Sequence, residues 1–132
     1  MTTRQRVADY MVVDLITLSP ETEINRAMNL LLDRRISGAP VVDKNGDLVG
    51  VLSKKDCLKA ALEASYYREW GGTVAQHMTK DVETLDAGTD IVTATKAFLN
   101  SVYRRFPVMK EGRLVGQISR ADVLRAMNDN WG

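Results

Sequence analysis

The chain contains an internal duplication, and this feature limits its possible folds more than any other. The segment Val7–Met11 returns 67 residues later as Val74–Met78. The same offset relates further positions, pairing Asp14 with Asp81, Thr17 with Thr84 and Pro40 with Pro107. Such a repeat indicates two copies of one supersecondary unit. Because about sixty residues bury too little surface to be stable alone, we expect the two copies to share a core.

Each copy is predicted to run strand, helix, strand, strand, helix. In the first copy residues 14–18 are extended, Ser19 is the expected N-cap and Pro20 the first helical residue. The predicted apolar face of that helix carries Ile24, Ala27, Met28, Leu31 and Leu32. Residues 39–42 and 48–52 are predicted strands around an Asn45-Gly46 turn, and the last helix follows Ser53 and runs to about residue 64.

The second copy follows the same order. Its first helix is expected to bury Ile91, Phe98, Leu99 and Val102. The predicted domain boundaries are residues 1–64 for the first repeat, 65–73 for a linker and 74–128 for the second repeat. The linker contains three large aromatic side chains that we expect to pack against the chain's own core, namely Tyr66, Tyr67 and Trp70.

A short motif ends the third predicted strand of each copy. It reads Gly50-Val51-Leu52-Ser53-Lys54-Lys55-Asp56 in the first and Gly116-Gln117-Ile118-Ser119-Arg120-Ala121-Asp122 in the second. Ser followed three residues later by Asp resembles a helix N-cap box. The same turn directs free backbone N–H groups, a hydroxyl and a carboxylate to one point, where a nucleotide's phosphate and ribose can bind. The residues alone leave both interpretations open, and the two roles are compatible.

Composition argues against several classes of function. A net charge of +1 gives no basis for bulk electrostatic binding to nucleic acid or to an acidic membrane. No apolar run is long enough to span a bilayer. The single cysteine, Cys57, excludes an intrachain disulfide, is expected to be core or half-buried, and makes the cytoplasm the default location. The single histidine, His77, lies opposite Tyr10 and is expected to pack or face solvent, so we predict neither catalysis nor a metal site.

The ordered set of motifs resembles a known family. A small-residue-Pro strand, a Gly-turn hairpin and Gly-apolar-apolar-Ser-x-x-Asp occur twice, over about Val7 to Met127, as in the tandem CBS-domain or Bateman module. This resemblance implies an α+β fold of two βαββα repeats packed through their sheets with pseudo-twofold symmetry. It also implies a regulatory module without enzymatic activity or an obligatory cofactor, which binds AMP, ADP, ATP or S-adenosylmethionine and signals to an unknown effector protein.

The resemblance further implies two clefts, each combining Ser and Asp of one repeat with strand residues of the other. The first would comprise Ile16, Thr17, Ser37, Gly38, Ala39, Pro40, Ser119, Arg120 and Asp122. The second would comprise Val82, Thr84, Arg104, Arg105, Phe106, Pro107, Ser53, Lys54 and Asp56. The Asp carboxylate would accept the ribose hydroxyls, and Arg would pair with phosphate.

The two expected clefts differ in their walls, because Ser37-Gly38 of the first repeat is replaced by Arg104-Arg105 in the second. Small residues leave room for an adenine ring, so we expect the Asp122 cleft to be the better nucleoside site. The more cationic Asp56 cleft is expected to prefer ligands with more phosphate and to lose affinity faster as salt rises.

The expected assembly is a twofold homodimer built on helical faces with Leu58, Ala61, Leu62, Val123, Leu124 and Met127. The chain is expected to be complete, and it is either a stand-alone sensor or a part of something larger. One alternative is a ligand-free interaction module in which Ser and Asp serve only as helix caps. Another is association with nucleic acid through a basic patch of Arg34, Arg35, Arg104 and Arg105, which sparse aromatic residues disfavour.

Overall fold

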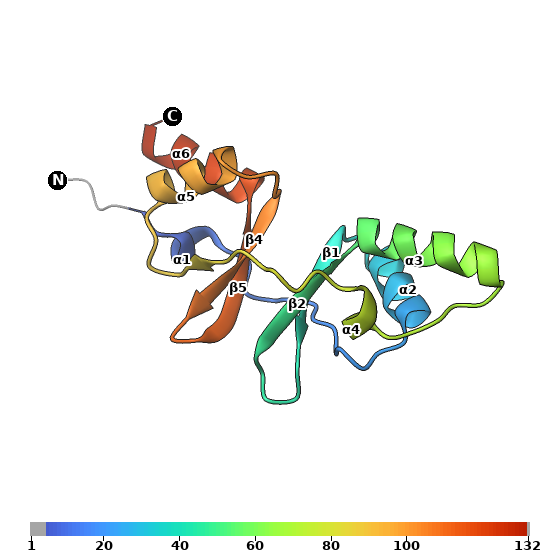
Figure 1. The fold of residues 1–132 in the computed structure, drawn as a ribbon. Helices are drawn as coiled ribbons and strands as arrows, with labels where there is room; N and C mark the ends of the chain where they lie inside the picture. The colour runs from blue at the N-terminus through green and yellow to red at the C-terminus, as the bar shows by residue number, and fades with distance from the viewer. Residues whose placement is uncertain (1–4, 132) are drawn as a thin grey trace. The chain divides into compact units, whose positions relative to one another are not determined.

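Helices and short strands alternate along the chain in the computed structural model, which describes residues 5–131. The described residues fall into two compact units (Figure 1). One unit is Ile16–Val82, and the other joins the residues up to Leu15 to those from Glu83 onward. The compact units therefore differ from the sequence repeats. The leading segment of the first repeat, up to Leu15, lies in the unit that contains most of the second repeat, and the leading segment of the second repeat lies in the unit Ile16–Val82.

The unit Ile16–Val82 is built around an antiparallel hairpin in which Gly38 pairs with Ser53 and Pro40 with Val51. Leu18 adds a parallel bridge to the hairpin, since its N–H donates to the Pro40 carbonyl at 2.9 Å. The elements of this unit are α2 (Ile24–Arg34), β1 (Gly38–Val42), β2 (Leu48–Ser53), α3 (Lys54–Tyr67) and α4 (Val74–His77). The two hairpin strands and their turn agree with the prediction, and Gly46 has the left-handed φ of 84° that such a turn requires. The predicted first strand, residues 14–18, does not form, and this segment contributes a single bridge at Leu18.

The other unit repeats this plan with a three-stranded sheet. Its middle strand pairs in parallel with one neighbour through Leu85 and Val108, and antiparallel with the other through Arg105 and Ser119. The elements of this unit are α1 (Val7–Tyr10), β3 (Leu85–Asp86), α5 (Ile91–Leu99), β4 (Arg105–Lys110), β5 (Arg113–Ser119) and α6 (Arg120–Trp131).

The short helices α1 and α4 are the exchanged parts of the two repeats. α1 contacts β5 and α6, whereas α4 contacts α2, α3 and β2. The second residue after each short helix forms an isolated bridge with a strand: Val12 pairs with Gln117, and Thr79 pairs with Val51. In each bridge both residues exchange N–H···O bonds of 2.8 to 2.9 Å. These bonds attach the leading segment of one repeat to the sheet of the other.

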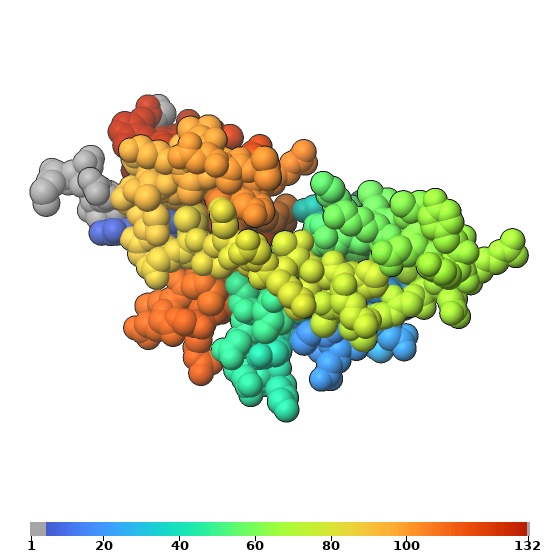
Figure 2. Space-filling view, viewed as in Figure 1, coloured from blue at the N-terminus to red at the C-terminus, as the bar shows by residue number. Residues whose placement is uncertain are grey.

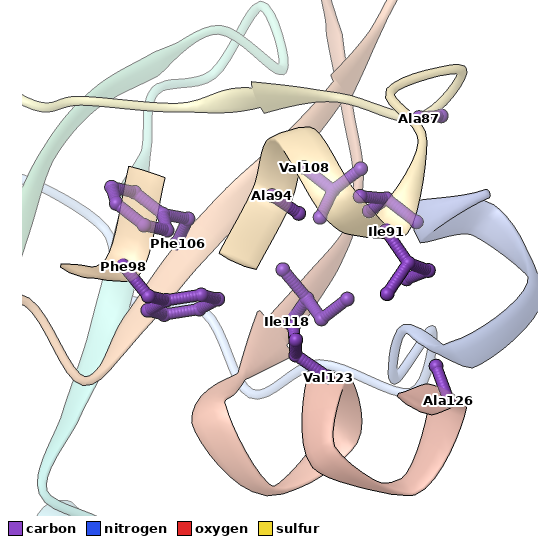
Figure 3. Close-up of a cluster of buried hydrophobic side chains, with 10 residues drawn as sticks. Ala87, Ile91, Ala94, Phe98, Phe106, Val108, Ile118, Val123 and Ala126 are labelled. Atoms are coloured by element: carbon purple, nitrogen blue, oxygen red, sulfur yellow. The ribbon is translucent and has the colours of Figure 1, made fainter. Parts of the chain in front are cut away.

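Each unit has its own cluster of buried apolar side chains. In the unit with α5 and α6, the rings of Phe98 and Phe106 lie 4.7 Å apart and are tilted by 55°. Figure 3 shows Ile118 and Val123 beside them, and Ile91 and Ala126 further along the same cluster. The equivalent cluster of the other unit comprises Leu18, Ile24, Ala27, Leu31, Ala39, Val41, Leu52, Cys57, Ala60 and Val74. The buried Cys57 agrees with its prediction.

The predicted N-cap at Ser19 is wrong, because α2 begins at Ile24 after Glu23. Residues before α2 form a turn instead, in which the Thr22 N–H donates to the Ser19 carbonyl at 3.2 Å. The carbonyls of Pro20 and Thr22 accept bonds from the first residues of α4, at 2.9 and 2.8 Å. This tertiary pairing uses the backbone groups that an earlier helix start would have required.

Several predicted core positions are also wrong. Leu32, Leu99 and Val102 are exposed, since α5 ends at Leu99 and both leucines lie at the ends of their helices. The linker aromatics are exposed rather than packed against the chain's own core. Because α3 extends beyond its predicted end to Tyr67, Tyr66 and Tyr67 lie on that helix, and Trp70 follows it. Conversely Val123, predicted on an exposed helical face, is buried in the cluster with Phe98.

Candidate functional site

The turn from β2 into α3 holds Ser53 and Asp56 in a reciprocal pair of hydrogen bonds. The Asp56 N–H donates to Ser53 Oγ at 3.1 Å, and the Ser53 N–H donates to Asp56 Oδ2 at 3.0 Å. Asp56 is buried although it is charged. Each bond satisfies a backbone N–H that has no partner inside the helix, so both residues are locked in place.

The turn from β5 into α6 has the same geometry. The Asp122 N–H donates to Ser119 Oγ at 3.2 Å, and the Ser119 N–H donates to Asp122 Oδ2 at 2.9 Å. The capping interpretation is therefore confirmed in both copies. It uses one oxygen of each carboxylate and leaves Oδ1 for another partner.

The two carboxylates differ in what contacts the remaining oxygen. Asp122 Oδ1 accepts a bond from Arg125 Nη2 at 2.8 Å, and this is an ion pair between positions three residues apart on α6. Asp56 Oδ1 lies 3.4 Å from the hydroxyl of Thr79, which is longer than a normal O–H···O bond. Within residues 5–131 Asp56 forms no ion pair. The i,i+3 spacing of Asp122 and Arg125 is visible in the sequence, whereas nothing local indicates Thr79.

The start of β1 lies against the first turn of α3. The Ser37 carbonyl accepts a bond from the Lys54 N–H at 2.8 Å, and Gly38 pairs with Ser53. A Cβ atom on Gly38 would lie 2.8 Å from the Leu52 carbonyl oxygen. Only glycine fits this close approach without a backbone shift.

The corresponding place in the other unit carries a large cation. The Arg104 carbonyl accepts a bond from the Arg120 N–H at 3.2 Å, and Arg105 pairs with Ser119. The buried Nε of Arg105 has no hydrogen-bond partner among the described residues. A buried donor without a partner is costly, and an anion beside it would remove that cost.

The remaining predicted site residues lie on or next to the same strands. Thr17 precedes the Leu18 bridge to β1, and Thr84 precedes β3. Four further residues are buried in the middle of their strands, namely Ala39 and Pro40 of β1, and Phe106 and Pro107 of β4. Ile16 and Val82 are half-buried at the two ends of one unit. Each unit brings together the strand start and the Ser-x-x-Asp turn of one repeat, whereas each predicted cleft combines residues of both units.

Other chemistry finds little support in the described residues. No group of three or more His, Cys, Asp or Glu side chains is placed to hold a metal ion between residues 5 and 131. A ring nitrogen of His77 lies 2.9 Å from the Gly71 carbonyl, which agrees with a packing role. Burial, and then the Asp56 carboxylate, raise the pKa of the Cys57 thiol. None of the described helices is long and apolar enough to cross a membrane.

Comparison with known proteins gives consistent matches over nearly the whole chain. CBSX1, a chloroplastic CBS domain-containing protein of Arabidopsis thaliana, is 32% identical over 86% of this chain and 59% of that protein. The structure of CBSX2 of the same plant in complex with AMP is 31% identical with a TM-score of 0.82, covering 95% of this chain and 97% of that one. Inosine-5'-monophosphate dehydrogenase of Thermoplasma acidophilum is 33% identical over 91% of this chain but only 23% of the enzyme.

The chain thus spans less than two thirds of the length of these two curated relatives, and the match to the dehydrogenase covers only a minor part of that enzyme. The family model described as the CBS domain matches twice, over residues 7–63 and 74–129. These two segments coincide with the duplicated sequence and contain both Ser-x-x-Asp turns. The chain therefore belongs to the CBS-domain family, as a tandem pair of CBS domains or Bateman module.

Proposed function

We propose that this chain is a regulatory module that binds an adenosine-containing ligand and transmits its binding to a partner protein, without catalysing a reaction. The observation that carries the proposal is the pair of locked Ser-x-x-Asp turns, each with a buried carboxylate at a strand-to-helix junction. The structure of CBSX2, which matches 95% of this chain, has been solved in complex with AMP. The ligand class proposed is AMP, ADP, ATP or S-adenosylmethionine.

The chemistry of the turns suits an adenosine ligand. Ribose presents two hydroxyl donors, and a carboxylate oxygen that is free of backbone bonds can accept them. The N-termini of α3 and α6 favour negative charge, so a phosphate is stabilised there. The exposed side chains of Lys54 and Arg120 stand at the first position of each helix and add positive charge.

The two residue sets predicted from the sequence are retained as the proposed binding sites. One set is Ile16, Thr17, Ser37, Gly38, Ala39 and Pro40 with Ser119, Arg120 and Asp122. The other is Val82, Thr84, Arg104, Arg105, Phe106 and Pro107 with Ser53, Lys54 and Asp56. The unpartnered Nε of Arg105 supports a preference of the second set for ligands with more phosphate, because an anion would satisfy that donor. Small residues at the start of β1, namely Ser37, Gly38 and Ala39, support nucleoside binding at the first set, because they leave room for an adenine ring.

Thermal melting with adenosine, AMP, ADP, ATP and S-adenosylmethionine tests the proposal. A ligand at 100 times its dissociation constant adds about 2.7 kcal/mol of stability. Asp56→Ala and Asp122→Ala are each expected to weaken binding at one site, with a loss of about 0.3–1 kcal/mol of stability, because each Asp lies in the first turn of its helix and not at the N-cap. Glu63→Ala is the matched control, since Glu63 is an exposed acid on α3. Unchanged ligand binding in the double Asp variant would disprove the ribose role.

The second candidate function is a ligand-free interaction module. It is favoured by the capping bonds, which account for Ser53, Asp56, Ser119 and Asp122 without any ligand. The absence of a melting shift with every adenine compound would favour this alternative.

We further propose that the module forms a twofold homodimer. Three apolar side chains at four-residue spacing, Leu58, Leu62 and Tyr66, are exposed along α3, and Leu124 and Trp131 are exposed on α6. Figure 2 shows the α3 surface in green. An exposed apolar row of this kind favours a protein interface. A cytoplasmic location is proposed from the reduced single cysteine.

A further inference from the structure

Arg125 occupies the carboxylate oxygen that the proposed ribose contact requires. Its Nη2 donates to Asp122 Oδ1 at 2.8 Å, while Asp122 Oδ2 already accepts from the Ser119 N–H at 2.9 Å. We propose that Arg125 is a specificity-determining residue, which lowers nucleoside affinity at Asp122 by competing with the ribose hydroxyls. This inference rests on the function proposed above and adds a regulatory contact to the same site.

Arg125 and a ribose hydroxyl compete because little of the Asp122 side chain is exposed. Each carboxylate oxygen can accept two hydrogen bonds, but the Asp122 side chain is only 7% exposed, so little of it can be reached by a ribose hydroxyl while its present partners remain. The backbone bond from Ser119 is part of the helix cap and is costly to break. The Arg125 side chain is 58% exposed, so it can rotate into water at small cost. Arg125 is therefore the partner that a ligand displaces.

The other repeat supplies a natural comparison. Lys59 stands three residues after Asp56, as Arg125 stands three residues after Asp122. Asp56 forms no ion pair within the described chain, and its Oδ1 has only the 3.4 Å contact with Thr79. At the position of Thr79, the other copy has Val12, which lacks a hydroxyl. The lysine at this spacing thus forms no ion pair with the carboxylate, whereas the arginine does.

The difference between the two cations explains the asymmetry. Arg presents a rigid planar fork that matches a carboxylate, whereas Lys carries a strongly hydrated point charge on a flexible stem. The free energy of ligand binding that is lost at Asp122 equals the free energy of the ion pair that must be broken. For a half-exposed pair this is a factor of roughly two to five in the dissociation constant.

A charge-conserving exchange tests the inference. Arg125→Lys is measured in an Asp56→Ala background, and Lys59→Arg in an Asp122→Ala background, by calorimetric titration with adenosine. Adenosine carries the ribose hydroxyls without a phosphate, so attraction between Arg and phosphate does not enter the result. We expect Arg125→Lys to tighten adenosine binding by roughly two- to fivefold and Lys59→Arg to weaken it by the same factor.

A second measurement covers the case in which a background variant fails to fold. The amide NMR shifts of Ser53 and Ser119 report each site separately in chains that retain both Asp residues. Adenosine is expected to saturate the Ser119 signal at lower concentration in Arg125→Lys than in the unmodified chain. Ser53 saturation should be unchanged.

The outcomes separate this inference from the proposed function. If AMP and adenosine bind but neither exchange alters affinity, the role of Arg125 is disproved and the proposed function stands. Weaker adenosine binding by Arg125→Lys would show that Arg125 assists the ligand, which also overturns the inference. If no adenine compound binds any variant, both proposals are wrong.

Discussion

Gly50 and Gly116 lie where the exchanged segments pass close to the sheets. A Cβ atom on Gly50 would lie 2.6 Å from the sulfur of Met78 and 2.9 Å from the Thr79 carbonyl oxygen. A Cβ atom on Gly116 would lie at the same two distances from the Met11 sulfur and the Val12 carbonyl oxygen. We therefore predict that Gly50→Ala and Gly116→Ala destabilise the fold equally.

The magnitude follows from which neighbour can move. The methionine side chain is flexible and can rotate away. The Thr79 carbonyl cannot move freely, because it accepts the Val51 N–H at 2.9 Å and the Thr79 N–H donates back to Val51 at 2.9 Å. Overpacking of this kind costs about 1–3 kcal/mol. Breaking both bonds would add about 1 kcal/mol for each.

Urea unfolding followed by circular dichroism measures this effect. With an m-value of about 2 kcal/mol/M, a loss of about 2 kcal/mol lowers the midpoint by about 1 M. Gly71→Ala is the matched control, because no atom lies within 4 Å of its Cβ position and the substitution should leave the midpoint unchanged. A midpoint for Gly50→Ala equal to that of the control would refute the reasoning, since the segment after α4 would then not be held against β2.

Three further predictions concern pH, reactivity and assembly. The hydrogen bond from Tyr10 to Asp129 raises the pKa of the Tyr10 phenol, so its stabilisation is present below about pH 10 and is lost as pH rises through the raised folded-state pKa. Melting temperatures across that range should show this loss in the unmodified chain and not in Tyr10→Phe. Burial raises the pKa of Cys57, so alkylation by iodoacetamide at neutral pH should be slow in the folded chain and fast in urea, and equal rates would contradict the burial. Leu58→Lys is expected to convert the proposed dimer to a 14.7 kDa monomer in light scattering, and an unchanged mass would exclude this surface.

Local sequence signals predicted those parts of the fold that depend on neighbouring residues. The Asn45-Gly46 turn forms as predicted, because Gly46 supplies a left-handed φ. The Ser-x-x-Asp pattern predicted both helix starts, because the bonds of a capping box lie within four consecutive residues. The duplication itself predicted that both copies would form the same helices and the same hairpin in the same order. The copies differ where the second has β3 and the first has a single bridge at Leu18.

The candidate site was predictable only in part. Both Asp residues and their serines were identified from their motif, and the structure places them as locked caps. The partners of the second carboxylate oxygens were not identified. Thr79 is 23 residues from Asp56, so its position beside the carboxylate is a consequence of the fold.

Tertiary structure decided where α2 begins and where α1 and α4 lie. Ser19 has the sequence of an N-cap, yet α2 begins at Ile24, since the carbonyls of Pro20 and Thr22 bond to the start of α4. The same exchange places α1 and α4 in the unit of the other repeat. The sequence determined the elements because turns and caps depend on adjacent residues. It left these placements undetermined because two similar copies offer each short helix nearly equivalent strands, and only the assembled fold selects between them.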